Sequence, residues 1–212
     1  MNADDTENIN SSDSERDQRH AETMRRHKAV FDAQQANATQ EKGLIIVHTG
    51  SGKGKTSAGL GMVFRALGHG MRIGVVQFTK GAIQTGEAAF ANELTGRIDF
   101  YTLGEGYTWE TQNRQRDIAT AHEAWEQACK LLDDPQYHIV LLDELNIILR
   151  YGYLPLDAVI EKLQNKREDL HVIVTGRNAK DELIEIADLV TEMKQIKHPY
   201  KAGIKAQKGI EF

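Results

Sequence analysis

The sequence predicts an α/β fold with a mostly parallel central sheet of about six strands and helices on both faces. Two observations lead to this prediction. Short apolar runs alternate with longer stretches of helical pattern, which is the order of βαβ units. The apolar runs are also rich in Val, Ile and Leu, as strands covered on both faces are. A chain of 212 residues suffices for one such domain but not for two large ones.

The individual elements follow from these patterns. The candidate strands are residues 44–48, 72–78, 98–102, 138–142, 171–175 and 189–193. The clearest helix spans about residues 114–132, where an apolar stripe recurs every three or four positions: Ala121, Trp125, Ala128 and Leu132. Cys129 lies near this stripe, which favours core packing over chemistry. Pro155 suits the first turn of a further helix over residues 156–166.

The first 41 residues differ from the rest. Residues 1–15 are rich in Asn, Asp, Glu and Ser, a composition that predicts disorder. Residues 16–41 contain no Gly or Pro and favour a helical arm. The arm's apolar residues are few (Met24, Val30, Phe31), so it either docks on another surface or stays solvated and frayed. Residues 42–212 form the predicted α/β domain.

Bulk composition narrows the function classes. The net charge of −5 disfavours a nucleic-acid partner, which usually requires a basic patch. The single cysteine excludes a disulfide within the chain and fits a reducing compartment. No apolar run approaches the length of a membrane span, and the polar N-terminus does not resemble a signal peptide. We therefore expect a cytoplasmic protein that does not enter a membrane.

A glycine-rich segment, Gly50-Ser51-Gly52-Lys53-Gly54-Lys55-Thr56, lies between the first strand and a helical pattern over residues 57–67. In this context a glycine loop indicates phosphate binding. Glycines let backbone N–H groups approach phosphate oxygens, and the helix N-terminus adds a positive dipole end. Lys55 supplies a cation and Thr56 a hydroxyl for Mg²⁺. We predict a P-loop NTPase (RecA-like) domain that contacts a nucleotide through Gly50 to Ser57.

The loop departs from the generic motif. That motif has a glycine five positions before Gly54, where this chain has Thr49, and Lys53 is an additional cation. A glycine-rich turn with a chance Lys-Thr pair is the alternative, which the flanking strand and helix disfavour. The loop alone does not reveal which bond of the nucleotide breaks.

The apolar run 139–142 ends in two carboxylates, Asp143 and Glu144, in the Walker B pattern. Open α/β sheets bind ligands at the carboxyl ends of their strands. Asp143 is therefore expected to hold Mg²⁺ opposite Thr56, directly or through water. Glu144 has two interpretations: a base that activates water, or a carboxylate that the dipole favours at a helix start.

Two further segments follow predicted strands. Arg177, in the sequence Thr-Gly-Arg-Asn, is either a bidentate partner for phosphate or carboxylate or a member of a surface ion pair. The segment 104–113 carries Tyr107 and Trp109 between glycines and polar residues. Two aromatics in such a loop indicate either that it binds a flat ligand or forms a mobile lid, or that it buries Trp109 in the core.

From about residue 16 to 212 the chain resembles the P-loop corrinoid adenosyltransferases, also called cob(I)alamin or cob(I)yrinic acid a,c-diamide adenosyltransferases. That family shares the displaced glycine and extra lysine of the segment 49–56. Its other motifs match residues 74–78, 107–113, 142–145, 175–177, 197–198 and 205–211. Two departures are small: Ser51 stands where the family often has Asn, and Tyr107 where it often has Phe.

The resemblance implies a specific reaction. A Co(I) corrinoid attacks the 5′ carbon of ATP, and inorganic triphosphate leaves. Because Co(I) is already a strong nucleophile, no general base is required. The protein must align the two reactants and stabilise charge on the leaving triphosphate. Lys53, Lys55, Arg177, loop N–H groups and Mg²⁺ (or Mn²⁺) are implied for that task, with Glu144 among the nucleotide contacts.

The resemblance also implies how Co(I) is formed and which partners take part. Aromatic side chains displace the lower cobalt ligand, and Tyr107 and Trp109 stand at the matching positions. A reduced flavoprotein or free flavin supplies the electron. Family members work as homodimers in which the N-terminal helix helps to cover the corrinoid. From the residues alone, a kinase or ATPase using Glu144 as base, or a nucleotide-binding module without catalysis, stays open.

Overall fold

The computed structural model describes residues 3–79, 85–104 and 113–211. The chain divides into two compact units, residues 1–41 and 42–212, and each is described by itself. In the described part of the chain, no helix is long and apolar enough to cross a membrane.

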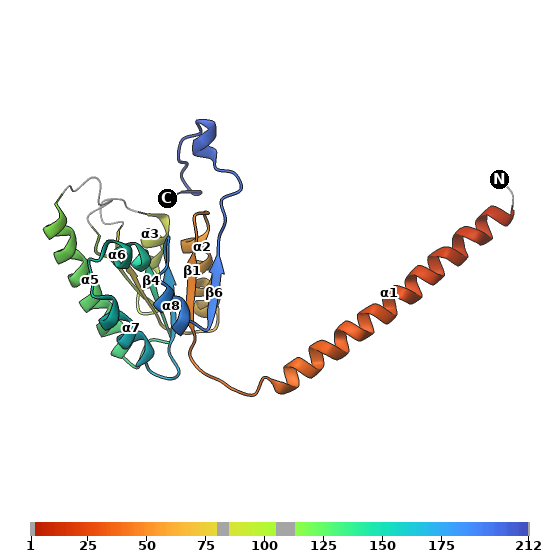
Figure 1. The fold of residues 1–212 in the computed structure, drawn as a ribbon, viewed down its shortest axis with the longest axis horizontal. Helices are drawn as coiled ribbons and strands as arrows, with labels where there is room; N and C mark the ends of the chain where they lie inside the picture. The colour runs from red at the N-terminus through yellow and green to blue at the C-terminus, as the bar shows by residue number, and fades with distance from the viewer. Residues whose placement is uncertain (1–2, 80–84, 105–112, 212) are drawn as a thin grey trace. The chain divides into compact units, whose positions relative to one another are not determined.

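The second unit is built on one six-stranded sheet, whose strands are all parallel (Figure 1). Along the chain the strands are β1 (Ile45–Thr49), β2 (Ile73–Gln77), β3 (Ile98–Thr102), β4 (Ile139–Asp143), β5 (His171–Thr175) and β6 (Leu189–Glu192). Their spatial order is β3-β2-β4-β5-β1-β6. One strand, β5, thus separates the strand before the glycine loop from the strand that ends in Asp143. This arrangement confirms the predicted α/β fold of the P-loop, RecA-like kind.

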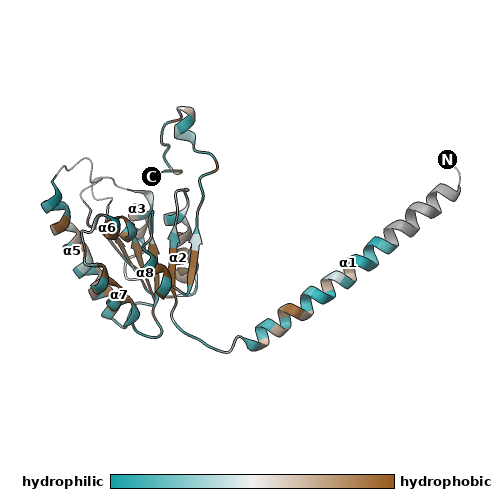
Figure 2. Cartoon of the chain, viewed as in Figure 1, coloured by the Kyte–Doolittle hydropathy of each residue, from teal (hydrophilic) through white to brown (hydrophobic). Residues whose placement is uncertain are grey.

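Helices cover both faces of the sheet. The helices of one face are α2 (Lys55–Gly68) and α3 (Gly86–Glu93). Those of the other are α5 (Arg114–Asp133), α6 (Leu145–Tyr151), α7 (Leu156–Gln164) and α8 (Asp181–Ile186). A 3₁₀ turn, η1 (Pro199–Ala202), lies in the segment after β6. Figure 2 shows the hydrophobic residues gathered on the strands and on the helices beside them.

Strand alternation divides the core into two clusters. On β4, Val140 and Leu142 pack with α5 to α8, whereas Ile139 and Leu141 pack with α2 and α3. Successive side chains of a strand point to opposite faces, so an apolar run is buried on both. Six strands form where the sequence predicts them, with ends shifted by at most one residue. This is the usual uncertainty of element boundaries.

The predicted apolar stripe of α5 is confirmed in part. Ala121, Ala128 and Leu132 are fully buried, while Trp125 is only partly buried against the same cluster. Cys129 is partly buried, and burial raises the pKa of its thiol. A raised thiol pKa disfavours the reactive thiolate.

The first unit contains one helix, α1 (Ala3–Asn37). It begins within the segment for which composition predicts disorder, and it ends four residues before the end of the predicted arm. No Gly or Pro interrupts it, and its described side chains form ion pairs one turn apart, such as Glu22–Arg26 at 2.7 Å and Lys28–Asp32 at 2.6 Å. Such pairs each add a few tenths of a kcal/mol, roughly, to a helix.

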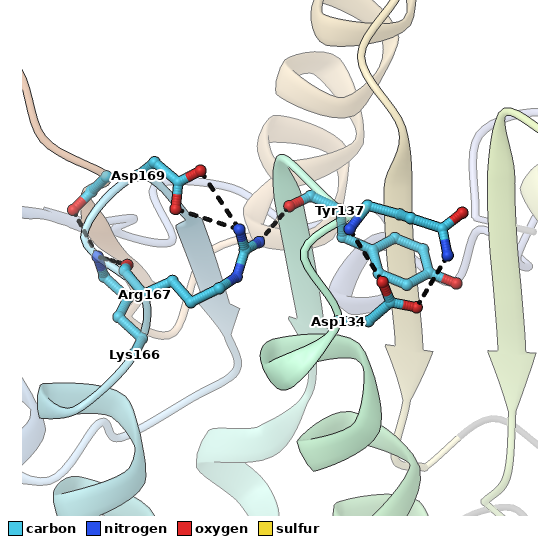
Figure 3. A network of polar contacts seen from close by, with 7 residues as sticks. Asp134, Tyr137, Lys166, Arg167 and Asp169 are labelled. Carbon is cyan, nitrogen blue, oxygen red and sulfur yellow. Dashed lines mark hydrogen bonds and ion pairs between the residues drawn. The ribbon is translucent and has the colours of Figure 1, made fainter.

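A polar network ties together the loops that enter β4 and β5 (Figure 3). Arg167 donates to the carbonyl of Tyr137 at 2.5 Å and pairs with Asp169 at 3.2 Å. Lys166 donates to the carbonyl of Gly43, just before β1, at 2.7 Å. These contacts lie at the amino ends of the strands, so they brace the edge of the sheet opposite the glycine loop.

Candidate nucleotide-binding site

A row of polar side chains crosses the carboxyl ends of the strands on the α2 face. The row consists of Thr102, Gln77, Asp143, Thr175, His48 and Thr191, one from each strand. Parallel pairing puts these strand ends at one edge, and the two-residue period turns their side chains to one face. The sequence patterns predict Asp143 here but not the whole row.

Hydrogen bonds centre this row on Asp143, which is fully buried. One of its oxygens, Oδ1, accepts from the hydroxyls of Thr56 and Thr175, each at 2.7 Å. The other accepts from Nε2 of Gln77 at 3.0 Å. Three donors hold the carboxylate in a single orientation and compensate for its burial. The structure therefore brings together Thr56 and Asp143, the pair predicted to hold Mg²⁺.

His48 differs from the other side chains described in this row because it is buried without a hydrogen bond to the described residues. Its side chain is 3% exposed, and neither ring nitrogen has a hydrogen-bond partner among the described residues. Burial lowers the pKa of this imidazole, because desolvation disfavours the charged form.

The backbone geometry of the loop explains the displaced glycine. Gly50 and Gly54 have φ of +100° and +106°, the left-handed region that favours glycine. A Cβ on Gly50 would lie 2.4 Å from the carbonyl oxygen of Met193, and one on Gly52 would lie 2.8 Å from the same atom. The segment after β6 thus packs directly on the loop, and the Gly52 N–H donates to the Met193 carbonyl at 2.7 Å.

Helix α2 begins at Lys55, two residues earlier than its pattern predicts. Lys55 and Thr56 therefore occupy its first turn. No side chain of the described residues caps this helix, and no carboxylate lies in its first turn. A helix N-terminus with uncapped N–H groups and a positive dipole end suits an anion.

Lys55 is a buried cation, only 6% exposed. Its ammonium donates to the carbonyl of Gly52. Burial lowers the pKa of Lys55, the nearby Glu144 carboxylate opposes that effect, and the nearby charges of Arg177 and Lys53 reinforce it. These four residues, predicted separately from the sequence, are thus close enough to interact. Three cations around one edge of the sheet provide the charge that a polyphosphate requires.

Lys53, the extra lysine of the loop, forms an ion pair with Glu211 near the end of the chain. The Lys53 side chain is half exposed, and the Glu211 side chain is largely covered. The tail after β6 therefore reaches the glycine loop twice, through Met193 and through Glu211.

Glu144 adopts a left-handed conformation, with φ of 64°, at the N-terminus of α6. Its side chain does not cap that helix, so the interpretation as a helix-start carboxylate receives no support from capping. Its backbone N–H donates to the Thr175 hydroxyl at 2.9 Å. A Cβ on Gly176 would lie 3.2 Å from Oε2 of the Glu144 carboxylate. Gly176 thus allows this carboxylate to lie against the β5 end.

The residues fit a magnesium ion. Thr56 and Asp143 offer a hydroxyl and a carboxylate side by side, the hard oxygen donors that Mg²⁺ prefers. The described residues contain no cluster of three or more His, Cys, Asp or Glu side chains that would hold a metal. Mg²⁺ is often bound by one or two carboxylates together with waters and substrate phosphates, so a two-residue donor set suits a metal that arrives with the nucleotide.

The aromatic loop is the predicted part of the site that the structure does not test. Tyr107 and Trp109 lie outside the described residues, which resume at Asn113. Asn113 is the N-cap of α5, and its side chain accepts from the Arg116 N–H at 3.1 Å. The described ends of this segment, Gly104 and Asn113, follow β3 and precede α5.

The generic nucleotide-binding motifs do not predict some contacts of the site. Gln77 and Thr175 orient Asp143, and Glu211 pairs with Lys53. The signal for Gln77 and Thr175 is a polar residue at the carboxyl end of an apolar strand. Glu211 lies in the segment 205–211, which matches a motif of the resembled family, but nothing in the sequence indicates its pairing with Lys53, 158 positions away.

Comparisons with known proteins agree with this geometry. Residues 41–212 match the family model described as ATP:corrinoid adenosyltransferase BtuR/CobO/CobP. A corrinoid adenosyltransferase of Pseudomonas aeruginosa is 57% identical over 198 residues, which cover 93% of this chain and 98% of that one. One from a Sinorhizobium species is 54% identical, covering 92% of each chain. One from Escherichia coli K12 is 43% identical, covering 92% of this chain and 99% of that one.

Proposed function

Since the chain belongs to the family of ATP:corrinoid adenosyltransferases, we propose which of its residues carry out each part of that reaction. The enzyme transfers the 5′-deoxyadenosyl group of ATP to the Co(I) centre of a corrinoid. The cobalt donates its electron pair to the 5′ carbon, the bond from that carbon to the triphosphate oxygen breaks, and triphosphate leaves. The loop therefore binds a leaving group, and none of its phosphorus atoms is attacked.

Lys55 is the principal group that stabilises the departing triphosphate. The observation that carries this role is its burial at the N-terminus of α2, beside Glu144 and Arg177. A buried cation acts in a poorly screened environment, so it interacts strongly with charge that develops in the transition state. The loop amides between Gly50 and Ser57, apart from that of Gly52, complete the anion site with Lys53 and Arg177. Glu144 keeps Lys55 protonated.

Thr56 and Asp143 hold the Mg²⁺ or Mn²⁺ that accompanies ATP. When bound, the metal neutralises part of the phosphate charge and orients the oxygens of the leaving group. The bonds from Gln77 and Thr175 fix the Asp143 carboxylate before the metal arrives. This preorganisation lowers the cost of assembling the metal site.

Tyr107 and Trp109 act on the corrinoid. By their match to the family's motif, their rings displace the lower ligand of cobalt, which eases reduction of Co(II) to Co(I). A reduced flavoprotein or flavin donates the electron, and the reaction takes place in the cytoplasm. The working form is a homodimer, and α1 covers the corrinoid when it is bound. The exposed apolar side chains Met24, Val30 and Phe31 of α1 support a docking role.

The experiment that tests these roles is the identity of the phosphate product. Anaerobic incubation of the protein with ATP and a chemically prepared Co(I) corrinoid should yield a light-sensitive cobalt–carbon product and triphosphate in equal amounts. Release of ADP and phosphate without corrinoid would contradict adenosyl transfer and favour a phosphoryl-transfer enzyme. Lys55→Ala should abolish most of the activity, whereas Lys130→Ala, at an exposed lysine of α5, should retain it.

A further inference from the structure

Thr49 occupies the position at which the generic phosphate loop has a glycine, and its side chain contacts a different part of the site. Its hydroxyl oxygen accepts a hydrogen bond from the N–H of Ala179 at 3.0 Å, across 130 positions of sequence. The residue is 7% exposed, so the bond is shielded from water. Ala179 ends the turn that follows β5 and carries Arg177.

The backbone explains why a side chain is allowed at this position. Outside the glycines, only Glu144 and Asn178 have positive φ among the described residues. Thr49 therefore needs none of the conformational freedom of glycine. Gly50 makes the sharp turn instead, with φ of +100°. The displaced glycine leaves position 49 free for a hydroxyl.

The turn that carries Arg177 is anchored on its other side as well. The N–H of Gly176 donates to the carbonyl of His48 at 3.2 Å, and the Gly176 carbonyl accepts from the side chain of Asn146 at 3.0 Å. Asn178 takes the left-handed conformation, with φ of 55°, that Asn tolerates better than most residues. The backbone is thus fixed before and after Arg177, while the Arg177 side chain is exposed.

We infer that Thr49 is a positioning residue that holds the Arg177 turn against the phosphate loop, so that the guanidinium faces the triphosphate. This inference rests on the proposed role of Arg177. An exposed arginine on an unanchored turn loses conformational entropy when it binds an anion. Anchoring the turn through Thr49 removes part of that cost before ATP arrives.

The test is a double-mutant cycle read out by the equilibrium binding of inorganic triphosphate with Mg²⁺. Thr49→Val keeps the shape of the side chain but leaves the Ala179 N–H without its acceptor, and Thr49→Ser keeps the acceptor. We expect Arg177→Ala to weaken binding about tenfold or more, and Thr49→Val about three- to tenfold. Thr49→Ser should bind like the unsubstituted protein. In the Arg177→Ala background, Thr49→Val should change the affinity less than about twofold.

Each outcome decides a different point. If Thr49→Val weakens binding equally with and without Arg177, Thr49 acts through the loop itself and the inference is wrong. If Arg177→Ala binds as tightly as the unsubstituted protein, the role of Arg177 fails and the inference fails with it. Neither result changes the identity of the phosphate product, which tests adenosyl transfer separately. Hydrogen exchange at the Ala179 amide should speed up in Thr49→Val, and Thr49→Ala serves if the valine variant does not fold.

Discussion

Replacing Gly50 by alanine tests whether the segment after β6 shapes the phosphate loop. Two costs act on the new methyl group. It must adopt a φ of +100°, and it must lie 2.4 Å from the Met193 carbonyl oxygen and 2.7 Å from the Met193 nitrogen. Both neighbours are backbone atoms, so no side chain can rotate away. The loop or the segment after β6 has to move.

The two costs can be estimated separately. A left-handed conformation costs a non-glycine residue about 1–2 kcal/mol, and overpacking a well-packed site costs about 1–3 kcal/mol. Gly50→Ala should therefore lower the free energy of unfolding by about 2–5 kcal/mol. Gly70 is the matched control, because it has φ of +76° but no atom within 4 Å of an added Cβ. Gly70→Ala should lower the free energy of unfolding only by the cost of the left-handed conformation, about 1–2 kcal/mol.

The assay is denaturant unfolding followed by circular dichroism, with triphosphate binding measured in parallel. Gly61→Ala completes the series, since Gly61 lies within α2 with open space around it and should stabilise the helix by about 0.5–1 kcal/mol. Triphosphate affinity should fall in Gly50→Ala and stay unchanged in the other two variants. Equal destabilisation in Gly50→Ala and Gly70→Ala would show that the contact with Met193 does not constrain the loop.

Three further predictions concern single side chains. Because burial lowers the pKa of His48 below its ordinary value of 6.5, the unfolded chain binds a proton more readily, and unfolding free energy should fall as pH drops below about 6.5. In His48→Phe the unfolding free energy, measured by denaturation at several pH values, should fall less below about pH 6.5. If it falls as steeply as in the unsubstituted protein, His48 is not the group responsible. Glu211→Gln should tighten triphosphate binding about two- to fivefold, since Glu211 competes with the anion for the half-exposed Lys53, with Glu185→Gln as the neutral control. Weaker binding would show that Glu211 supports the site. Trp109→Ala should slow the reaction from Co(II) far more than from prepared Co(I), and equal losses would remove it from the reduction step.

The local sequence pattern is sufficient to predict the strands of the fold. The apolar runs predict all six strands, because burial on both faces leaves little room for polar residues. The strand-end position also predicts that Asp143 and Thr56 meet. The sequence pattern predicts the start of α2 two residues late, because Lys55 and Thr56 are part of the loop motif but have helical backbone.

Long-range contacts were harder to predict. The pairing of Lys53 with Glu211 and of Thr49 with Ala179 depends on how distant segments meet, and neither segment has a periodicity that marks it. Gly52 is a similar case. Its position in the loop suggests that its backbone N–H approaches the phosphate. That N–H, however, already donates a hydrogen bond to the Met193 carbonyl. The physical need for glycine there comes at least in part from the protein's own chain.

This contact between Gly52 and Met193 makes the phosphate loop a composite of two distant segments. Grafting residues 49–56 alone into another nucleotide-binding protein would transfer the glycines without the backbone they pack on. A graft that retains the loop's shape would need residues 192–194 as well, together with the pairing of β6 and β1 that places them. The displaced glycine is then one part of a two-part structural motif, and the other part is the backbone at the end of β6.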